Sequence, residues 1–153
     1  MKLSTRGEYA LRALLVLGLQ YSDSVVTVQA VAEAQNIPKR FLEQILNDLR
    51  SAGVVQSKRG VAGGYRLARR PEQIKLSSVL RQIEGMLAPL GCVSEFFYEK
   101  CSCPDEGRCP IRSVMKEVRD AVVEIMDRVT VADLCERWQR AQSETAGSSD
   151  YTI

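Results

Sequence analysis

The chain has 153 residues, of which 45% are hydrophobic and 26% charged, so it has the size and composition of one globular domain, or of a small domain with an appended arm. Its net charge of +2 is unevenly placed: residues 1–75 hold 12 Lys and Arg against 6 Asp and Glu, whereas residues 76–153 hold 9 against 13. The basic first half is a candidate partner for a polyanion. The chain offers no histidine, no nucleotide-binding glycine fingerprint and no nucleophile beside a base, and this composition argues against an enzyme.

The first twenty residues carry charged side chains within an apolar pattern and lack a small-residue cleavage site. They therefore indicate neither a signal peptide nor a membrane span, and we expect a cytoplasmic protein. Thiols stay reduced in the cytoplasm, so clustered cysteines there are expected to bind metal or do redox chemistry rather than form structural disulfides.

Three helices are predicted in the first third of the chain. Apolar residues recur at helical spacing from Thr5 to about Tyr21, and Thr27 can cap a short second helix that ends at "QNIP". Pro38 suits the first turn of a third helix, and Gly53 is the residue expected just past its end. The apolar residues of this third helix form one stripe that we expect to be buried: Phe41, Leu42, Ile45, Leu46 and Leu49.

Two short strand-like runs, "VVQS" and "GYRLA", follow the third helix and are joined by the glycine-rich segment "KRGVAGG". Two antiparallel strands after three helices predict a winged helix-turn-helix. The expected fold class is therefore mainly α with a small β wing, with a DNA-binding domain over residues 1–85.

The second half is expected to hold a cysteine loop over 86–109, a dimerisation helix and a short terminal helix over 110–140, and a disordered tail over 141–153. Ser77 opens a short helix before the loop, Pro110 begins the long one, and "TVAD" is a capping signal for the last. Six apolar residues of the long helix are spaced 4, 3, 4, 3, 4, like heptad a and d positions: Ile111, Met115, Val118, Val122, Ile125 and Val129. An intramolecular core helix is the alternative, but we favour a homodimer because the preceding domain is already compact.

DNA is read in a helix-turn-helix by residues near the start of the second helix of the motif. Four polar residues occupy that place: Lys39, Arg40, Glu43 and Gln44. Lys58 and Arg59 at the wing tip can enter a minor groove. Each of these alone is an ordinary surface residue, but together they favour double-stranded DNA as the partner. A twofold dimer would then read a pseudo-palindromic operator with half-sites about 34 to 36 Å apart.

Four of the five cysteines are clustered, at Cys92, Cys101, Cys103 and Cys109. Thiolates are soft ligands that suit iron–sulfur clusters and zinc. Zinc sites usually contain two close cysteine pairs, each with two to four residues between its members, which this loop does not supply. The spacing alone leaves an iron–sulfur cluster, zinc and plain reactive thiols open.

Three stretches, "MKLSTRGEYALRALLVLG", "FLEQILNDLRSAGVVQSKRGVAGGYRLAR" and "CPIRSVMKEV", resemble the Rrf2 family of winged-helix transcription regulators, whose members include IscR, NsrR and RirA. The resemblance runs over about residues 1–140 in the same order, and "LEQIL" followed by "RGxxGGY" is a specific pairing. It implies a dimeric bacterial repressor or activator in which three loop cysteines hold an iron–sulfur cluster, with 2Fe-2S favoured and 4Fe-4S as the alternative. Cluster state would change DNA affinity in response to iron, nitric oxide, oxidants or cluster supply.

The resemblance places the first cluster ligand at Cys92 and the last at Cys109. The middle ligand is open, because the family's frequent ending of two cysteines with five residues between them selects Cys103, whereas Cys101 lies closer to the expected distance from Cys92. The chain departs from the family pattern here, since it offers four thiols where three are usual.

The fourth ligand varies in the family, and this chain has no histidine to supply it. In some members a carboxylate at the position of Glu8 reaches across from the partner subunit, so Glu8 is a candidate. The segment "TRGE" also fits a capping box, in which Glu8 would bond back to the N–H of Thr5 as cap. If the spare loop sulfur binds iron, Glu8 is only a capping residue.

The family's DNA contacts carry over to residues 39–44, to Arg59 and, near a phosphate, to Tyr9. Cys135 lies on an apolar helical face and is expected to be a small buried hydrophobe rather than a ligand. Two alternatives to the cluster sensor remain: a cluster-free family member that senses a metabolite or oxidant through a partner protein or a reactive thiol, and a structural zinc site in the loop.

Overall fold

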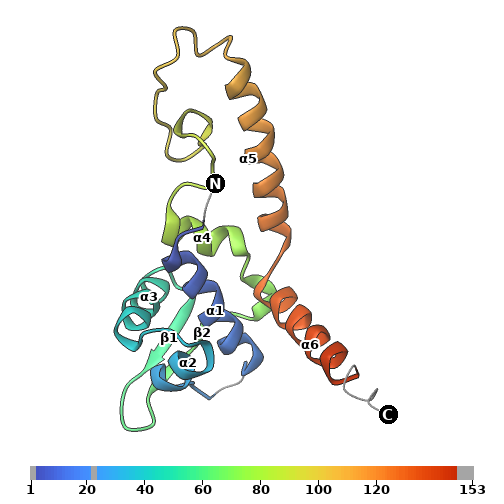
Figure 1. The fold of residues 1–153 in the computed structure, drawn as a ribbon. Helices are drawn as coiled ribbons and strands as arrows, with labels where there is room; N and C mark the ends of the chain where they lie inside the picture. The colour runs from blue at the N-terminus through green and yellow to red at the C-terminus, as the bar shows by residue number, and fades with distance from the viewer. Residues whose placement is uncertain (1–2, 22–23, 148–153) are drawn as a thin grey trace.

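The computed structural model describes residues 3–21 and 24–147 and has the predicted architecture, mainly helical with one small antiparallel sheet (Figure 1). A compact body contains the first helices and the sheet, and one long helix rises from it as an arm beside the cysteine loop, residues 86–109. The wing and the cysteine loop therefore lie at opposite ends of the molecule. The elements in chain order are α1 (Thr5–Leu19), α2 (Val28–Gln35), α3 (Lys39–Ser51), β1 (Val55–Lys58), β2 (Gly64–Leu67), the 3-10 turn η1 (Pro71–Gln73), α4 (Leu76–Glu84), the 3-10 turn η2 (Gly91–Val93), α5 (Pro110–Arg128) and α6 (Val131–Gly147).

Helices α1, α2 and α3 surround one apolar core. The predicted stripe of α3 is confirmed, because four of its members have no exposed surface and the fifth, Phe41, is half-buried at the edge. Helix α1 contributes Leu14 and Leu17 to the same core, with Ala10 and Ala13 allowing the helices to approach closely. Burial of this apolar surface fixes the orientation of α3, and so directs its polar side to the solvent.

The turn between α2 and α3 is built from local backbone chemistry. Thr27 caps α2 by accepting the N–H of Ala30 at 3.1 Å, as predicted. Asn36 ends α2 in the left-handed conformation, with φ of 49°. Pro38 was expected in the first turn of α3, but it is the N-cap, and the helix begins at Lys39. Gly53, with φ of 69°, follows the end of α3 as predicted.

Helix α1 is capped differently from the prediction. Ser4 is its N-cap and accepts the N–H of Gly7 at 3.1 Å. Glu84, at the end of α4, accepts hydrogen bonds from the N–H and the hydroxyl of Ser4, at 3.2 and 2.5 Å from its Oε1. The predicted capping box of Thr5 with Glu8 is therefore wrong: the cap lies one residue earlier, and its carboxylate comes from a residue 80 positions away.

The wing is a two-stranded antiparallel hairpin in which Val55 pairs with Leu67 and Lys58 pairs with Gly64. An isolated bridge between Val26 and Tyr65 attaches β2 to the segment before α2. Gly64 is required at this bridge, because a Cβ there would collide with the carbonyl group of Val26. The hairpin is thus anchored close to its last strand pairs, and the tip beyond them, residues 59–62, is exposed.

Helix α6 begins with the predicted capping signal. The hydroxyl and N–H of Thr130 donate to Asp133 Oδ2 at 2.7 Å each, and Asp133 N–H donates back to Thr130 Oγ1 at 3.3 Å. These bonds lower the pKa of Asp133. The helix is longer than predicted, because residues 141–147 continue it instead of starting a disordered tail. Helix-forming Ala and Gln favour this continuation, and the hydroxyls of Ser143 and Thr145 bond preceding carbonyls within it. The rest of the predicted tail, 148–153, lies outside the described residues.

Helix α5 presents two apolar rows rather than the single heptad seam. An inner row faces its own chain, where Met115 packs beside the cysteine loop and Met126 against the main core. The predicted seam mixed the two rows, because neighbouring rows of a helix are only about a quarter-turn apart. The outer row is exposed in the single chain and keeps a 3, 4, 3, 4 spacing: Ile111, Val114, Val118, Ala121 and Ile125.

Candidate functional site

The outer face of α3 carries the four residues predicted to read bases. Lys39, Arg40, Glu43 and Gln44 are all exposed, and they lie on the side of the helix opposite Leu42 and its buried neighbours. Lys39 and Arg40 stand in the first turn, which is the part of a recognition helix that enters the major groove. The geometry is therefore that of a recognition helix with a cationic start.

The wing places Lys58 and Arg59 at the end of β1, where both side chains are exposed. Gly60 has a φ of 113° and lets the chain reverse at this point. Figure 1 shows the wing beside α3 at the lower end of the body. Helix α3 and the wing are therefore neighbouring elements of the candidate DNA surface.

The side chain of Tyr9, on α1, packs against α3, the predicted recognition helix. Its ring meets the ring of Phe41 edge-on, with 5.7 Å between centroids, and the Arg12 guanidinium lies 5.2 Å from the Tyr9 centroid. The ring is half-buried, so Tyr9 supports the position of α3. Its contact with a DNA phosphate stays a prediction.

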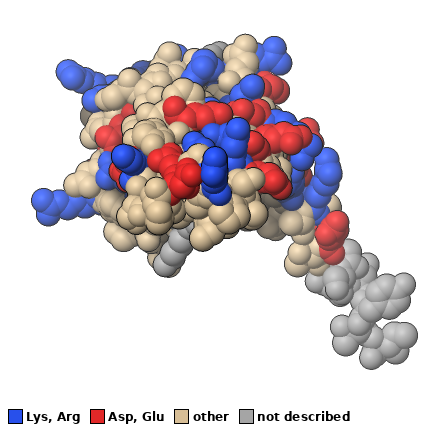
Figure 2. Space-filling view, turned by 90° about the horizontal axis from the view of Figure 1, so that it is seen from above, with Lys and Arg blue, Asp and Glu red and all other residues tan. Residues whose placement is uncertain are grey.

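The cysteine-loop end of the molecule has a different surface. Figure 2 looks onto this end and shows basic and acidic side chains interspersed over it. A mixed surface does not attract a polyanion in the way that a basic groove does. The candidate DNA surface is therefore the exposed face of α3 and the wing rather than this end.

All four loop cysteines line one cavity of about 270 Å³ at the top of the arm. Cys92 is buried, with 5% of its surface exposed, and the other three thiols are half-exposed. The cavity is formed by the turn η2, the extended segment 99–103 and the start of α5. The fold thus brings together sulfurs that are up to seventeen residues apart in the sequence.

Neighbouring thiols of the cavity contact one another. Cys103 Sγ and Cys109 Sγ are 3.7 Å apart, and hydrogen bonds with Cys101 and Cys109 raise the pKa of Cys103 to about 12. Burial, and then the nearby Cys101 thiol, raise the pKa of Cys92. The N–H of Arg112 donates to Cys109, which caps α5, and this bond lowers the pKa of Cys109.

This donor set fits a thiolate-bound metal centre. Thiolates bind iron–sulfur clusters and zinc, and the cavity is large enough for more than one atom. Among the described residues, however, no group of three or more Cys, Asp or Glu side chains surrounds a single point at the distance of one ion. The thiols are spread over the cavity wall instead.

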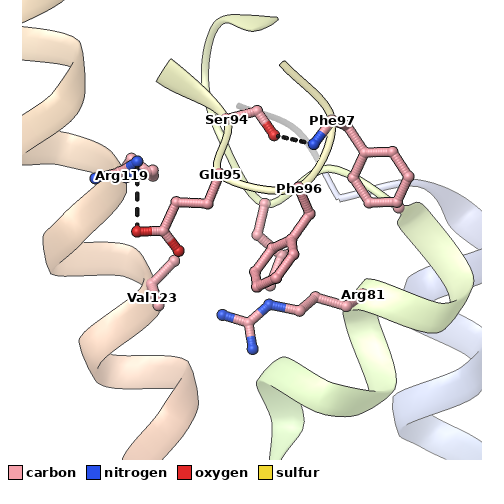
Figure 3. A pocket seen from close by; sticks show the side chains of 9 residues that line it. Arg81, Ser94, Glu95, Phe96, Phe97, Arg119 and Val123 are labelled. Carbon is pink, nitrogen blue, oxygen red and sulfur yellow. Dashed lines mark hydrogen bonds and ion pairs between the residues drawn. The ribbon is translucent and has the colours of Figure 1, made fainter. Parts of the chain in front are cut away.

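Two arginines of α5 fasten the loop around Cys92. Arg112 Nε donates to the carbonyl oxygen of Cys92 at 3.2 Å, and Arg119 Nη1 donates to that of Val93 at 2.8 Å. Arg119 is 9% exposed and also pairs with Glu95 at 3.6 Å, which Figure 3 shows as a dashed line. The backbone beside Cys92 is therefore held directly by α5.

Sequence reasoning did not find these arginine contacts. The signal was present, because Arg119 falls in helical register with Met115, Val122 and Met126, where a charged residue needs a buried partner. On the other side of the same loop segment, Arg81 of α4 lies over the Phe96 ring, with 5.3 Å between the guanidinium and the ring centroid (Figure 3). Helices α4 and α5 thus hold the loop between them.

Glu8 lies away from the cysteine cavity, whose lining comes from residues 90–112 alone. Its side chain is 58% exposed and pairs with Arg12 Nη1 at 3.2 Å, one turn along α1. Cys135 is also outside the loop: it packs on the core beside Gly18, and burial raises its pKa. Cys135 thus packs as a small hydrophobe outside the cavity, but it is half-buried rather than fully buried as expected.

Comparisons with known proteins identify the family of the chain. A profile of the Rrf2 family, described as iron-dependent transcriptional regulators, matches residues 3–137. An rrf2-like HTH-type transcriptional regulator of Rhodobacter capsulatus is 43% identical over 131 residues, which cover 83% of this chain and 87% of the relative.

Two solved structures share the fold. CymR of Bacillus subtilis, the global cysteine regulator, superposes with a TM-score of 0.75 at 30% identity, covering 90% of this chain and 98% of its own. IscR of T. potens superposes with a TM-score of 0.74 at 30% identity, covering 93% and 91%. In the part of the chain that the structure describes, no helix is long and apolar enough to cross a membrane. Because the family profile spans nearly the whole chain and its relatives are regulators rather than enzymes, this chain belongs to the Rrf2 family of DNA-binding transcription regulators.

Proposed function

We propose that this protein is a cytoplasmic, dimeric transcription regulator whose operator affinity is controlled by an iron–sulfur cluster in the cysteine cavity. The observation that carries the proposal is the cavity itself, in which four thiols face one another at the start of α5. Thiolates of this loop would hold the cluster, which supplies a group that reacts with oxidants, nitric oxide or changes in iron supply. The iron dependence for which the Rrf2 family is described supports the same assignment.

A second copy of the chain is the natural partner for the outer row of α5. Four large members of the row are between 41% and 62% exposed, a degree of exposure that is costly for a continuous apolar stripe in water. The spacing of the row is that of a helix–helix seam. Dimerisation through α5 would present two recognition helices and two wings to a pseudo-palindromic operator.

The cysteine loop and the dimer row are neighbours, which suggests how cluster state reaches the DNA. Ile111 is the first member of the outer row and also lines the cysteine cavity, while Arg112 binds the carbonyl of Cys92. A change in the loop therefore acts on the part of α5 that would touch the partner. Coupling between the cluster and DNA is reciprocal and is typically about 1 to 3 kcal/mol.

A cluster-free regulator is the second candidate, and one observation favours it. The 3.7 Å contact between Cys103 and Cys109 places two thiols where oxidation can join them, and a structural relative is named as a cysteine regulator rather than an iron protein. A zinc ion is the third, since zinc also binds four thiolates. These candidates differ in the colour and metal content of the protein.

Anaerobic purification separates the three. The cluster regulator yields brown protein with iron and acid-labile sulfide in equal amounts, and its visible absorption disappears in air. Colourless protein with one zinc per chain would identify the zinc site. Protein without metal or sulfide, even after reconstitution with ferrous salt and sulfide, would support the thiol regulator and refute the cluster.

The wing provides a test of DNA reading. Replacing Arg59 with alanine is expected to weaken binding to an operator selected from a random duplex library, without changing iron content. A lost phosphate contact lowers affinity for all sequences and reduces the slope of log affinity against log salt by about one unit, whereas a lost base contact relaxes preference at one position. Arg140→Ala, an exposed arginine on α6, is the matched control. Unchanged affinity in Arg59→Ala would remove the wing from the interface.

A further inference from the structure

The thiols of the cysteine cavity form one connected set. Cys103 and Cys109 are the closest measured pair, with 3.7 Å between their sulfurs. Cys101 packs on the small buried cluster that contains Cys92, and its thiol is also a neighbour of Cys103. All four sulfurs belong to the same chain and face the same space.

A two-iron cluster needs as many thiolates as this cavity offers. Such a cluster takes four protein ligands, two on each iron. With tetrahedral metal–thiolate bonds of about 2.3 Å, as in zinc sites, two thiolates on one metal lie about 3.8 Å apart, close to the separation of Cys103 and Cys109. A single ion would instead need all its ligands around one point, and the described residues contain no such group of three.

The carboxylate of Glu8 is engaged elsewhere. It pairs with Arg12, which also donates to the backbone oxygen and the side-chain oxygen of Gln35 at the end of α2. Arg12 is therefore fixed between two helices of the DNA-binding body, and it holds Glu8 along α1. A ligand from a second subunit is needed only when the loop itself offers too few donors, and this loop offers four.

We infer that Cys101 is the fourth protein ligand, so that Cys92, Cys101, Cys103 and Cys109 of one chain complete a 2Fe-2S site and the partner's first helix supplies no ligand. This inference rests on the proposed cluster function and assigns its ligand set. The site would consequently be complete in a single subunit. Glu8 then serves only as the ion-pair partner of Arg12.

The test compares Glu8→Ala with Cys101→Ser in full-length protein, prepared without oxygen and reconstituted with ferrous salt and sulfide. Iron and sulfide per chain, the visible absorption and the Mössbauer spectrum are measured for each. Glu8→Ala is expected to match the wild type in all of them. Cys101→Ser keeps the size of the side chain but replaces sulfur by oxygen, so it is expected to shift the spectra and to weaken iron retention against a chelator at least tenfold, roughly the minimum loss seen when even an outer-shell partner is removed.

Each outcome decides the assignment. Altered spectra or lost iron in Glu8→Ala would overturn it, whatever Cys101→Ser does, and so would a Cys101→Ser protein that matches the wild type. Absence of iron and sulfide from the wild type would refute the proposed function itself. Circular dichroism of each variant confirms that the helices are intact.

Discussion

Replacing Cys109 with serine is expected to abolish cluster binding while the protein stays folded. Serine keeps an acceptor for the N–H of Arg112 at the N-cap of α5, so the helix retains its cap while the soft ligand is lost. Cys92→Ala is expected to have the same effect on iron, although it also removes a buried side chain. Iron, sulfide and visible absorption of anaerobic protein measure the loss.

Cys135→Ala is the matched control for this prediction. It removes a cysteine that packs against α1 and lies outside the cavity lining, so its iron content is expected to equal that of the wild type. Full cluster content in both Cys109→Ser and Cys92→Ala would show that the cavity is not the metal site. The alanine and serine variants together therefore distinguish loss of metal binding from loss of the N-cap of α5.

Placing a charge in the outer row of α5 is expected to separate the dimer. In Val118→Glu, the twofold interface would have to bury two carboxylates, and unpaired buried charge costs several kcal/mol. A monomer binds a two-half-site operator through one half-site, so affinity is expected to fall by about a hundredfold or more. Sedimentation measures the assembly, and fluorescence anisotropy with a selected operator measures the affinity.

Ser113→Glu is the control for this variant. It adds the same charge to an exposed position of α5 outside the outer row. A Val118→Glu protein that still sediments as a dimer would place the interface elsewhere. The same monomer also tests the ligand set, because a site completed by four thiols of one chain keeps its cluster after the subunits separate.

The parts of the fold that could be predicted from sequence depend on local patterns. The stripe of α3 follows from apolar spacing, the caps at Thr27 and Thr130 from residue chemistry, and the wing from its glycines. Each of these signals lies within a few residues of the structure that it specifies. The helix-turn-helix was accordingly found, and the four residues predicted to read bases are exposed in it.

The errors occurred where distant residues decide the structure. The cap of α1 depends on Glu84, 80 positions from Ser4, and Gly7 leaves the space that this carboxylate fills. The two rows of α5 differ only in which one meets the rest of the chain, a choice that helical spacing does not contain. Likewise, Arg112 and Arg119 find carbonyl partners 20 and 26 residues away.

The cysteine site was predicted in composition but not in arrangement. Sequence identified the four sulfurs, and the uneven gaps between them left the pairing open. In the structure the loop folds back on α5, so that Cys101 packs on the buried cluster containing Cys92 although eight residues separate the two cysteines. Arginine side chains of α5 hold the loop in this position by bonding the carbonyl groups of Cys92 and Val93. No periodic pattern in the sequence predicts these contacts.

The most direct test is a titration of one selected operator with the same protein preparation before and after the cluster is removed, without oxygen and at fixed salt. Removal of the cluster is expected to change the dissociation constant by about 5- to 150-fold, the range of typical allosteric coupling. By reciprocity, bound operator must change the equilibrium affinity of the protein for the cluster by the same factor. Equal dissociation constants for the loaded and the cluster-free dimer would contradict control of DNA binding by the cysteine site.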